Sequence, residues 1–403
     1  MQRIVLGVGA ICALTVSLTA QPAAPAAPAA TDPVRTLVGR LDLEKYKATV
    51  KGLTQFGDRR QGTERNRKAV DWIEAQLKSY GCTNTERLKY TYTTPIRKPN
   101  TGGQQRPAPD PNAIATASGG GRPRGIRAPT GVNNDPMKQP DEKLRALNSE
   151  PATDGPREQV YCTKIGATRP DEMYIIGAHM DGHGWGEAAN DNGSGTALVM
   201  ELARVFSSPD VVTDRSIRFA LWNNEETGLN GAYAYVEQRK DLQGKEDPPG
   251  SGRYPEPKWV GMIQHDMMMF DHGMPRADGT LNPEQRPEAD VNIEFQVTSK
   301  FLAGAQDLAW ALHRANEKYA TDYPSNVGEH MTNTDSTAFM DHVPSISLRE
   351  NERGIHTGSG WNPHWHQPTD VFATYSDKDF RLGLNAAQTT LAGVAQLTGA
   401  KLK

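Results

Sequence analysis

The stretch GAHMDGHGWGEAANDNGSG, residues 177–195, decides the fold that the sequence predicts. His179 and two aspartates, Asp181 and Asp191, lie among glycines and small polar residues, so the stretch can bury little apolar surface. It ends the apolar run EMYIIGAH, which predicts a buried strand, and precedes TALVMELARVF, whose apolar residues recur at helical spacing. A strand, a polar turn and a helix in this order are typical of an α/β protein.

The same alternation continues along the chain. The runs that predict strands are ERLKYTYTT, EQVYCTKIG, EMYIIGAH, SIRFALW, WVGMIQHDMM, VNIEFQV and PSISLRE. Helical patterns cover residues 63–81, with Thr63 as a possible cap, and TALVMELARVF, NGAYAYVEQR, FLAGAQDLAWALHRANEKY and LGLNAAQTTLAGVAQL. Strands alternating with helices predict an α/β three-layer sandwich, with a central mixed, mostly parallel sheet and helices on both faces.

The N-terminus, MQRIVLGVGAICALTVSLTAQPAAP, has a positive start, a short apolar core and small residues that suit cleavage. It predicts a signal peptide over residues 1–20, a Pro/Ala-rich linker over 21–33 and one domain over 34–403. The protein is therefore expected to be secreted or periplasmic, with no stable membrane span after cleavage. The alternative is an uncleaved anchor, but the apolar run is short for a membrane span.

Composition narrows the range of partners. The 403 residues carry a formal net charge of -3, which argues against nucleic acid or an anionic membrane as a partner. Residues 95–157 are rich in Pro, Gly, Asn and Arg, and we expect a low-complexity surface insertion there, disordered or irregular, with a basic docking arm as the alternative. Cys82 and Cys162 can form a disulfide or remain two core thiols. No pattern indicates an oligomeric state.

Chemically active side chains follow several predicted strands. His179 ends EMYIIGAH, Glu225 and Glu226 follow SIRFALW, Asp266 follows VGMIQH, and Asp191 lies just before a helix. Because ligands of such sheets bind beyond the carboxyl ends of the strands, we expect these side chains at one edge. Ligation by His, Asp and Glu without cysteine suits zinc, with manganese or cobalt as alternatives. The candidate side chains are more numerous than the ligands that one zinc ion needs, so we expect a carboxylate shared by two ions.

Three further details complete the candidate site. Glu225 and Glu226 are neighbours that point in different directions, so one can ligate metal while the other takes a proton from a metal-bound water. Asp181 can accept a hydrogen bond from the far ring nitrogen of His179 and fix its tautomer. A last ligand is expected from WNPHWHQPTD, where we favour His366 and keep His364 as the alternative.

These motifs form a set that resembles a known family. GAHMDG, ANDNGSG, NNEETGLNGAYAY, QHDMM, TDSTAFMDHVPSISL and HWHQPTD come in the order seen in the M28 family of zinc exopeptidases. The resemblance covers roughly residues 35–400 apart from the insertion at 95–157 and smaller ones near 240–257 and 272–290. It implies the zinc exopeptidase-like form of the sandwich fold predicted above and peptides as substrates.

The resemblance also implies a role for each site residue. His179 and Asp266 would hold one Zn²⁺, Glu226 and His366 the other, and Asp191 would bridge them and be followed by a cis peptide bond to Asn192. Glu225 would act as general base and acid, and Asp181 would orient His179. The implied reaction is attack of a metal-bound hydroxide on a peptide carbonyl, most simply the removal of N-terminal residues by an aminopeptidase.

The sequence departs from the family pattern at two places. Trp365 stands where many members have a tyrosine that can donate to the oxyanion, and Ser336 stands where many have a histidine. Asp335, just before Ser336, is kept and is expected behind the ligands or near the substrate. Of the remaining histidines, His183 is expected near the site, where it could touch substrate, and His265 in the packed core.

Other functions stay open on the same residues. A glutaminyl cyclase would use this fold with a single zinc ion, and a carboxypeptidase or dipeptidase of the family would grip another part of the peptide. A noncatalytic receptor or scaffold predicts lost ligands, whereas all five expected ligands and Glu225 are present.

Overall fold

The computed structural model describes residues 32–95, 132–271, 290–329, 334–350 and 362–403. The predicted signal peptide and nearly all of the predicted linker lie outside these ranges. The helices are α1 (Pro33–Val38), α2 (Leu43–Thr54), α3 (Glu64–Ser79), α4 (Glu142–Asn148), α5 (Gly193–Phe206), α6 (Asn230–Arg239), α7 (Leu302–Tyr319), α8 (Ser336–Phe339) and α9 (Asp377–Leu397), with short 3-10 turns η1 (Pro136–Lys138), η2 (Lys240–Leu242) and η3 (Phe372–Thr374). The strands are β1 (Thr85–Tyr92), β2 (Gly155–Lys164), β3 (Arg169–His179), β4 (Val211–Val212), β5 (Arg215–Trp222), β6 (Lys258–His265), β7 (Val291–Phe295), β8 (Ser325–Glu329), β9 (Ser345–Arg349) and β10 (Lys401–Leu402).

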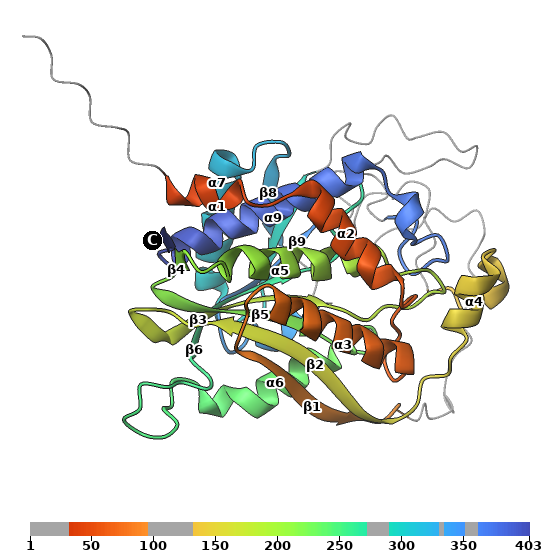
Figure 1. The fold of residues 1–403 in the computed structure, drawn as a ribbon, viewed down its shortest axis with the longest axis horizontal. Coiled ribbons are helices and arrows are strands. Elements are labelled where there is room, and N and C mark those ends of the chain that lie inside the picture. The colour runs from red at the N-terminus through yellow and green to blue at the C-terminus, as the bar shows by residue number, and fades with distance from the viewer. Residues whose placement is uncertain (1–31, 96–131, 272–289, 330–333, 351–361) are drawn as a thin grey trace, which may run out of the picture. The chain divides into compact units, whose positions relative to one another are not determined.

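One mixed sheet organises the part of the chain from Pro33 onward (Figure 1). Within the described residues its strand order is β1-β2-β5-β3-β6-β9-β7-β8. The central strands β5, β3, β6 and β9 run parallel, whereas β1, β2 and β7 pair antiparallel with neighbours. The carboxyl ends of the four central strands therefore meet at one edge, where His179 pairs with Trp222 and Ala178 with His265.

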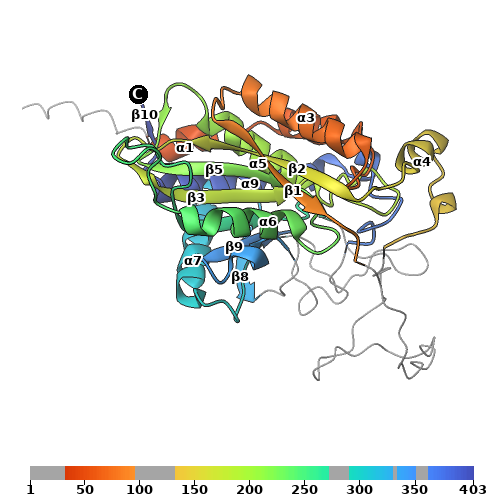
Figure 2. The ribbon, with the colours of Figure 1, turned by 90° about the horizontal axis from the view of Figure 1, so that it is seen from below.

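Helices cover both faces of this sheet. Alternate residues of β3 belong to two separate cores: Ile176 to the core that includes apolar residues of α1, α2, α3, α5, α7 and α9, and Ile175 to the core that includes residues of α6 and α8. Figure 2 shows α3 and α6 on opposite sides of the strands. The predicted α/β sandwich with a mixed, mostly parallel sheet is confirmed.

Sequence periodicity located most of the elements. Helix α3 begins directly after Thr63, whose side chain accepts a hydrogen bond from the Asn66 amide as its N-cap. The helices α1, α2, α4 and α8, the edge strand β8 and the two-residue strands β4 and β10 were not predicted. No helix in the described ranges is both long enough and apolar enough to cross a bilayer.

The insertion expected at 95–157 needs a correction. Residues 96–131 lie outside the described ranges, but residues 132–157 contain η1, α4 and the start of β2 rather than an irregular segment. Asp141 caps α4 by accepting hydrogen bonds from the amides of Lys143 and Leu144. The local cap and the apolar spacing of EKLRALN outweigh the polar composition of the surrounding stretch.

The two cysteines of the described chain form a disulfide. Cys82 lies just before β1 and Cys162 lies in β2, and the bond joins positions 80 residues apart in sequence. Of the two alternatives that the sequence left open, the structure contains the bonded one. The bond fastens the antiparallel edge of the sheet to the end of α3.

Candidate metal centre

Five side chains from distant parts of the chain converge at the carboxyl edge of the central strands. Nε2 of His179 lies 3.5 Å from Oδ1 of Asp191 and 3.4 Å from Oδ1 of Asp266. Nε2 of His366 lies 3.0 Å from Oδ2 of Asp191 and 3.0 Å from Oε2 of Glu226. The structure thus brings together all five residues expected as ligands, with one oxygen of Asp191 facing each histidine.

These separations suit two metal ions. Donor atoms around a tetrahedral zinc ion lie about 3.3 Å apart, because zinc bonds to nitrogen and oxygen are about 2.0–2.2 Å long. On one side of the Asp191 carboxylate, the distances from His179 to Asp191 and to Asp266 are close to this spacing, and on the other side so are the distances from His366 to Asp191 and to Glu226. The donor set therefore fits a pair of ions that share Asp191.

The electrostatics of the cluster favour cations. Burial opposes protonation of His179, but the charges of Glu225, Asp266 and Asp191 outweigh it and raise the pKa of His179 well above its ordinary value. Burial also opposes protonation of His366, but the negative charges of Glu226 and Asp191 outweigh this effect and raise the pKa of His366 to about 10. Both imidazoles thus lie in a strongly negative environment, which bound metal ions would neutralise.

Glu225 lies beside the donors with its carboxylate in a cavity of about 520 Å³. Its Oε2 is 4.0 Å from Nε2 of His179. Burial, together with the charges of Glu226, Asp335 and Asp266, raises the pKa of Glu225 well above its ordinary value, although His179 opposes the shift. Glu226 differs from Glu225. Burial alone would raise the pKa of Glu226, but the nearby His183 and His366 outweigh this effect and lower that pKa well below its ordinary value. The adjacent glutamates thus have different environments, as their adjacency predicts.

Asp181 acts through a different group than expected. Nδ1 of His179 donates to the backbone carbonyl of Asp181 at 3.0 Å. The carboxylate of Asp181 lies farther from that nitrogen, at 3.9 Å. That carboxylate instead accepts a hydrogen bond from the backbone amide of Glu225 at 3.0 Å. A carbonyl oxygen can only accept, so Nδ1 carries a proton, and in the neutral imidazole Nε2 then presents its lone pair to the cluster. The side chain of Asp181 positions Glu225.

Asp191 is held by a residue that the sequence analysis did not single out. The two carboxylate oxygens of Asp370 accept hydrogen bonds from the backbone amides of Asn190 and Asp191, at 2.8 and 3.0 Å. The peptide bond between Asp191 and Asn192 is cis, as the family resemblance implies. Asn192 then caps α5 by accepting a hydrogen bond from the Gly195 amide. Asp370 is the last residue of the motif HWHQPTD, so this motif could have indicated Asp370 from the sequence alone.

Two other buried ionisable residues, Arg349 and Asp335, lie near the cluster. Nη2 of Arg349, at the end of β9, donates to Oδ2 of Asp266 at 2.9 Å. Burial opposes ionisation of Asp266, but Arg349 and His179 hold the pKa of Asp266 below its ordinary value. Asp335 accepts a hydrogen bond from Gln264 at 2.8 Å, and burial raises the pKa of Asp335 to about 8. Arg349 also stands at the carboxyl end of a strand, so the argument that identified Asp266 from the sequence could have identified Arg349 as well.

The remaining candidates take distinct places. The indole of Trp365 stacks on the His366 ring with centroids 3.8 Å apart, and Trp365 lines the cavity. His183 lies against Glu226 and His366. His364 faces Thr369 instead, since its Nδ1 lies 2.8 Å from the Thr369 hydroxyl oxygen. His265 is buried, as predicted, and its Nε2 lies 2.8 Å from the hydroxyl oxygen of Thr390 on α9.

Residues of the predicted insertion contact the loop that carries the site. Asn148, at the end of α4, donates to the carbonyl of Gly186 at 2.7 Å and accepts from the Asp58 amide at 3.1 Å. Nε2 of Gln139 donates to the carbonyls of Trp185 and Pro368, at 2.8 and 2.9 Å. The described part of this insertion therefore braces the loop between His179 and Asp191.

We expect Asn148→Ala to lower the free energy of unfolding by about 1–3 kcal/mol, because it leaves a buried carbonyl and a buried amide unsatisfied. Asn134→Ala is the matched control, since Asn134 is exposed and its side chain donates only to the nearby Val132 carbonyl within the described residues. Urea unfolding of both variants measures the difference. Equal unfolding midpoints would show that the Asn148 contacts do not brace the loop.

The sequence of this chain matches a known protein family over the region that carries the site. Residues 160–387, more than half of the chain, match the family model described as Peptidase family M28. The chain belongs to peptidase family M28. The resemblance inferred from the motifs is confirmed.

Curated relatives in this family match only in part. Aminopeptidase YwaD of Bacillus subtilis is 43% identical over 74 residues, which are 18% of this chain and 16% of that protein. Aminopeptidase NAALADL1 of Mus musculus is 27% identical over 249 residues, or 59% of this chain and 30% of that protein. The matched segments span less than a third of either relative.

Solved structures share the fold of this M28 family member over most of its length. An aminopeptidase from Aneurinibacillus sp. strain AM-1 has a TM-score of 0.58 at 19% identity, covering 92% of this chain and 97% of that chain. A glutaminyl cyclase of Porphyromonas gingivalis has a TM-score of 0.53 at 15% identity, covering 89% and 99%. At such identities the likeness concerns the fold alone.

Proposed function

We propose that this protein is a zinc-dependent aminopeptidase that removes N-terminal residues from peptides. The observation that carries the proposal is the paired donor set around Asp191, with Glu225 beside it in the same cavity. His179 and Asp266 would hold one Zn²⁺, Glu226 and His366 the other, and Asp191 both. When bound, zinc supplies Lewis-acid chemistry that polarises a carbonyl group and lowers the pKa of water.

Glu225 is proposed to move the proton in this reaction. Its carboxylate lines the cavity and is buried, and the Asp181 carboxylate fixes its backbone. Glu225 would accept a proton from the attacking water and deliver it to the amine that leaves, so the same side chain serves as base and then as acid.

The cavity walls suggest what else would contact a peptide. Beside the donors, the cavity is lined by Leu229, Met267 and Trp365, and by the partly exposed Tyr233. These side chains would receive an apolar residue of the substrate. Attack at the N-terminal end is proposed because several curated relatives that this chain resembles are named aminopeptidases.

A second candidate is glutaminyl cyclisation, because a glutaminyl cyclase shares the fold over 89% of this chain. Such a reaction needs a peptide with N-terminal glutamine and releases ammonia instead of an amino acid. A noncatalytic role is less well supported, since all five donors and Glu225 are in place. A carboxypeptidase or dipeptidase would show a different dependence on the ends of the peptide.

The site of action is proposed to be outside the cytoplasm, with residues 1–20 as a signal peptide, 21–33 as a linker and 34–403 as the peptidase domain. The disulfide between Cys82 and Cys162 supports this proposal, because such bonds persist mainly in oxidising compartments.

The decisive experiment is hydrolysis of short peptides with free or acetylated N-termini, before and after chelation and after zinc is returned. We expect cleavage of the free peptides alone, loss of at least about 100-fold in rate on chelation, and recovery with zinc. Peptides with N-terminal leucine and aspartate compare apolar and acidic end residues. Peptides with N-terminal glutamine are assayed for ammonia.

Each outcome has a separate meaning. Cleavage that ignores acetylation would replace the aminopeptidase by an enzyme that acts at the C-terminus or internally. Ammonia release with no amino acid product would favour the cyclase. A sample shown to hold zinc that performs neither reaction would leave the noncatalytic alternative.

A further inference from the structure

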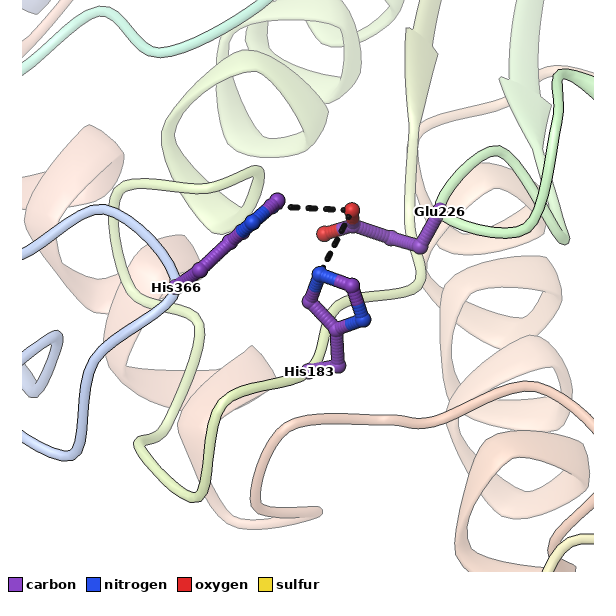
Figure 3. Close-up of side chains that lie close together, drawn as sticks. All are labelled: His183, Glu226 and His366. Carbon is purple, nitrogen blue, oxygen red and sulfur yellow. Dashed lines mark ion pairs between the residues drawn. The ribbon is translucent and has the colours of Figure 1, made fainter. Parts of the chain in front are cut away.

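His183 lies inside the cluster although the family resemblance does not assign it to the ligands. Its Nε2 is 3.0 Å from Oε2 of Glu226, the same separation that His366 has from that oxygen. The rings of His183 and His366 meet edge to face with centroids 4.0 Å apart. Figure 3 shows the two rings on different loops, with the carboxylate of Glu226 beside both.

The contact between His183 and Glu226 has the distance of a hydrogen bond but not its direction. Nε2 of His183 is buried and makes no hydrogen bond with any described residue, and the same is true of Oε1 of Glu226. A buried ring nitrogen without a partner costs free energy unless another group satisfies it. The donor atoms of His183, Glu226 and His366 lie within 4.8 Å of one another, a spacing that a single metal ion would satisfy.

The loop backbone is built to bring His183 to this place. Gly184 has φ of +98°, and a Cβ there would lie 2.4 Å from the backbone carbon of His366. Only glycine allows the loop to approach the His366 backbone so closely. On the other side, a Cβ on Gly182 would lie 2.4 Å from Cβ of Ala188. These close approaches on both sides hold His183 against the cluster.

We propose that His183 is a further protein ligand of the ion held by Glu226 and His366, an assignment that rests on the proposed zinc centre. Asp191, Glu226, His366 and His183 would then surround that ion. Four protein ligands are typical of firmly held, closed zinc sites, whereas three leave a position open. The ion beside His183 is therefore the more tightly bound of the two.

The test measures zinc rather than activity. X-ray absorption at the zinc edge should count three imidazoles for two zinc ions in the wild-type protein and two in His183→Ala. Competition with a chelator should show the more slowly released ion leaving at least about tenfold faster in His183→Ala. His364→Ala is the matched control and should change neither result, because His364 contacts Thr369 instead.

Two further variants separate ligation from hydrogen bonding. His183→Glu offers a carboxylate that can bind zinc but cannot donate, and His183→Gln offers an amide that can donate but is a poor zinc ligand. We expect slow release to persist in His183→Glu and to be lost in His183→Gln. The reverse order, or two imidazoles for two ions in the wild type, would overturn the assignment and leave His183 as a group that positions Glu226.

The same experiments distinguish failure of the proposed aminopeptidase activity from failure of the His183 assignment. A protein with three imidazoles on two zinc ions that cleaves no peptide would contradict the aminopeptidase and keep the assignment of His183. An active aminopeptidase with two imidazoles would do the opposite.

Discussion

Glu225→Gln is expected to lower kcat for peptide hydrolysis by about 10²–10⁴-fold while both zinc ions stay bound. The change keeps the size of the side chain and removes its ability to take and return a proton. Glu225 is not one of the five expected ligands, of which Asp191 is the shared one, so the ions lose no ligand assigned to them. Steady-state kinetics on zinc-loaded protein, with zinc measured in the same sample, test both halves of this expectation.

Glu237→Gln is the matched control for this substitution. Glu237 lies on α6, its side chain is 66% exposed, and it pairs with Lys240, so turnover should not change. Turnover of Glu225→Gln near the wild-type value would remove Glu225 from proton transfer. Loss of zinc from Glu225→Gln would instead show that its carboxylate is a ligand.

The sequence could predict the site to the extent that strand topology determines it. His179 and Asp266 stand at the ends of parallel strands that share an edge, and Glu225 and Glu226 follow a third such strand. Few side chains at strand ends are histidine or carboxylate by chance, so the pattern was visible without coordinates. The placement of His366 needed the motif HWHQPTD, because no strand carries it.

Backbone contacts could not be predicted in the same way. Spacing placed Asp181 near His179, but could not tell that the carbonyl would accept the imidazole proton and the carboxylate would bind the Glu225 amide. The helix α4 was hidden because its few apolar residues lie in a long polar stretch. His183 appeared as one more loop histidine, since its position depends on the close approach of Gly184 to the His366 backbone.

Arg59 is a further residue whose role depends on backbone contacts that the sequence does not reveal. In the polar run GDRRQGTERNR it looks like a solvated residue, yet its side chain is fully buried. Its guanidinium donates to the carbonyls of Met180, Glu187 and Ala188 at 2.7, 2.8 and 2.7 Å. One side chain thus fastens both ends of the loop that contains His183 and leads to Asp191.

Arg59→Met is expected to lower the free energy of unfolding by about 3–5 kcal/mol. Replacing a buried ion pair by apolar residues is often harmless, but here the partners are backbone carbonyls that no substitution removes. The carbonyls of Met180 and Glu187 would lose the only donor that the described residues give them. Arg59→Lys should recover little, because one ammonium cannot reach carbonyls spread along the loop.

The measurement should use metal-free protein, because zinc binds the folded state and would add its own stabilisation. Arg60→Met is the matched control: Arg60 is the next residue, is exposed, and its side chain has no hydrogen bond to a described residue. If both variants unfold at the same denaturant concentration, the guanidinium of Arg59 does not stabilise the loop. If only Arg59→Met is destabilised, its zinc affinity should fall as well, since a displaced loop moves Asp191 away from His366.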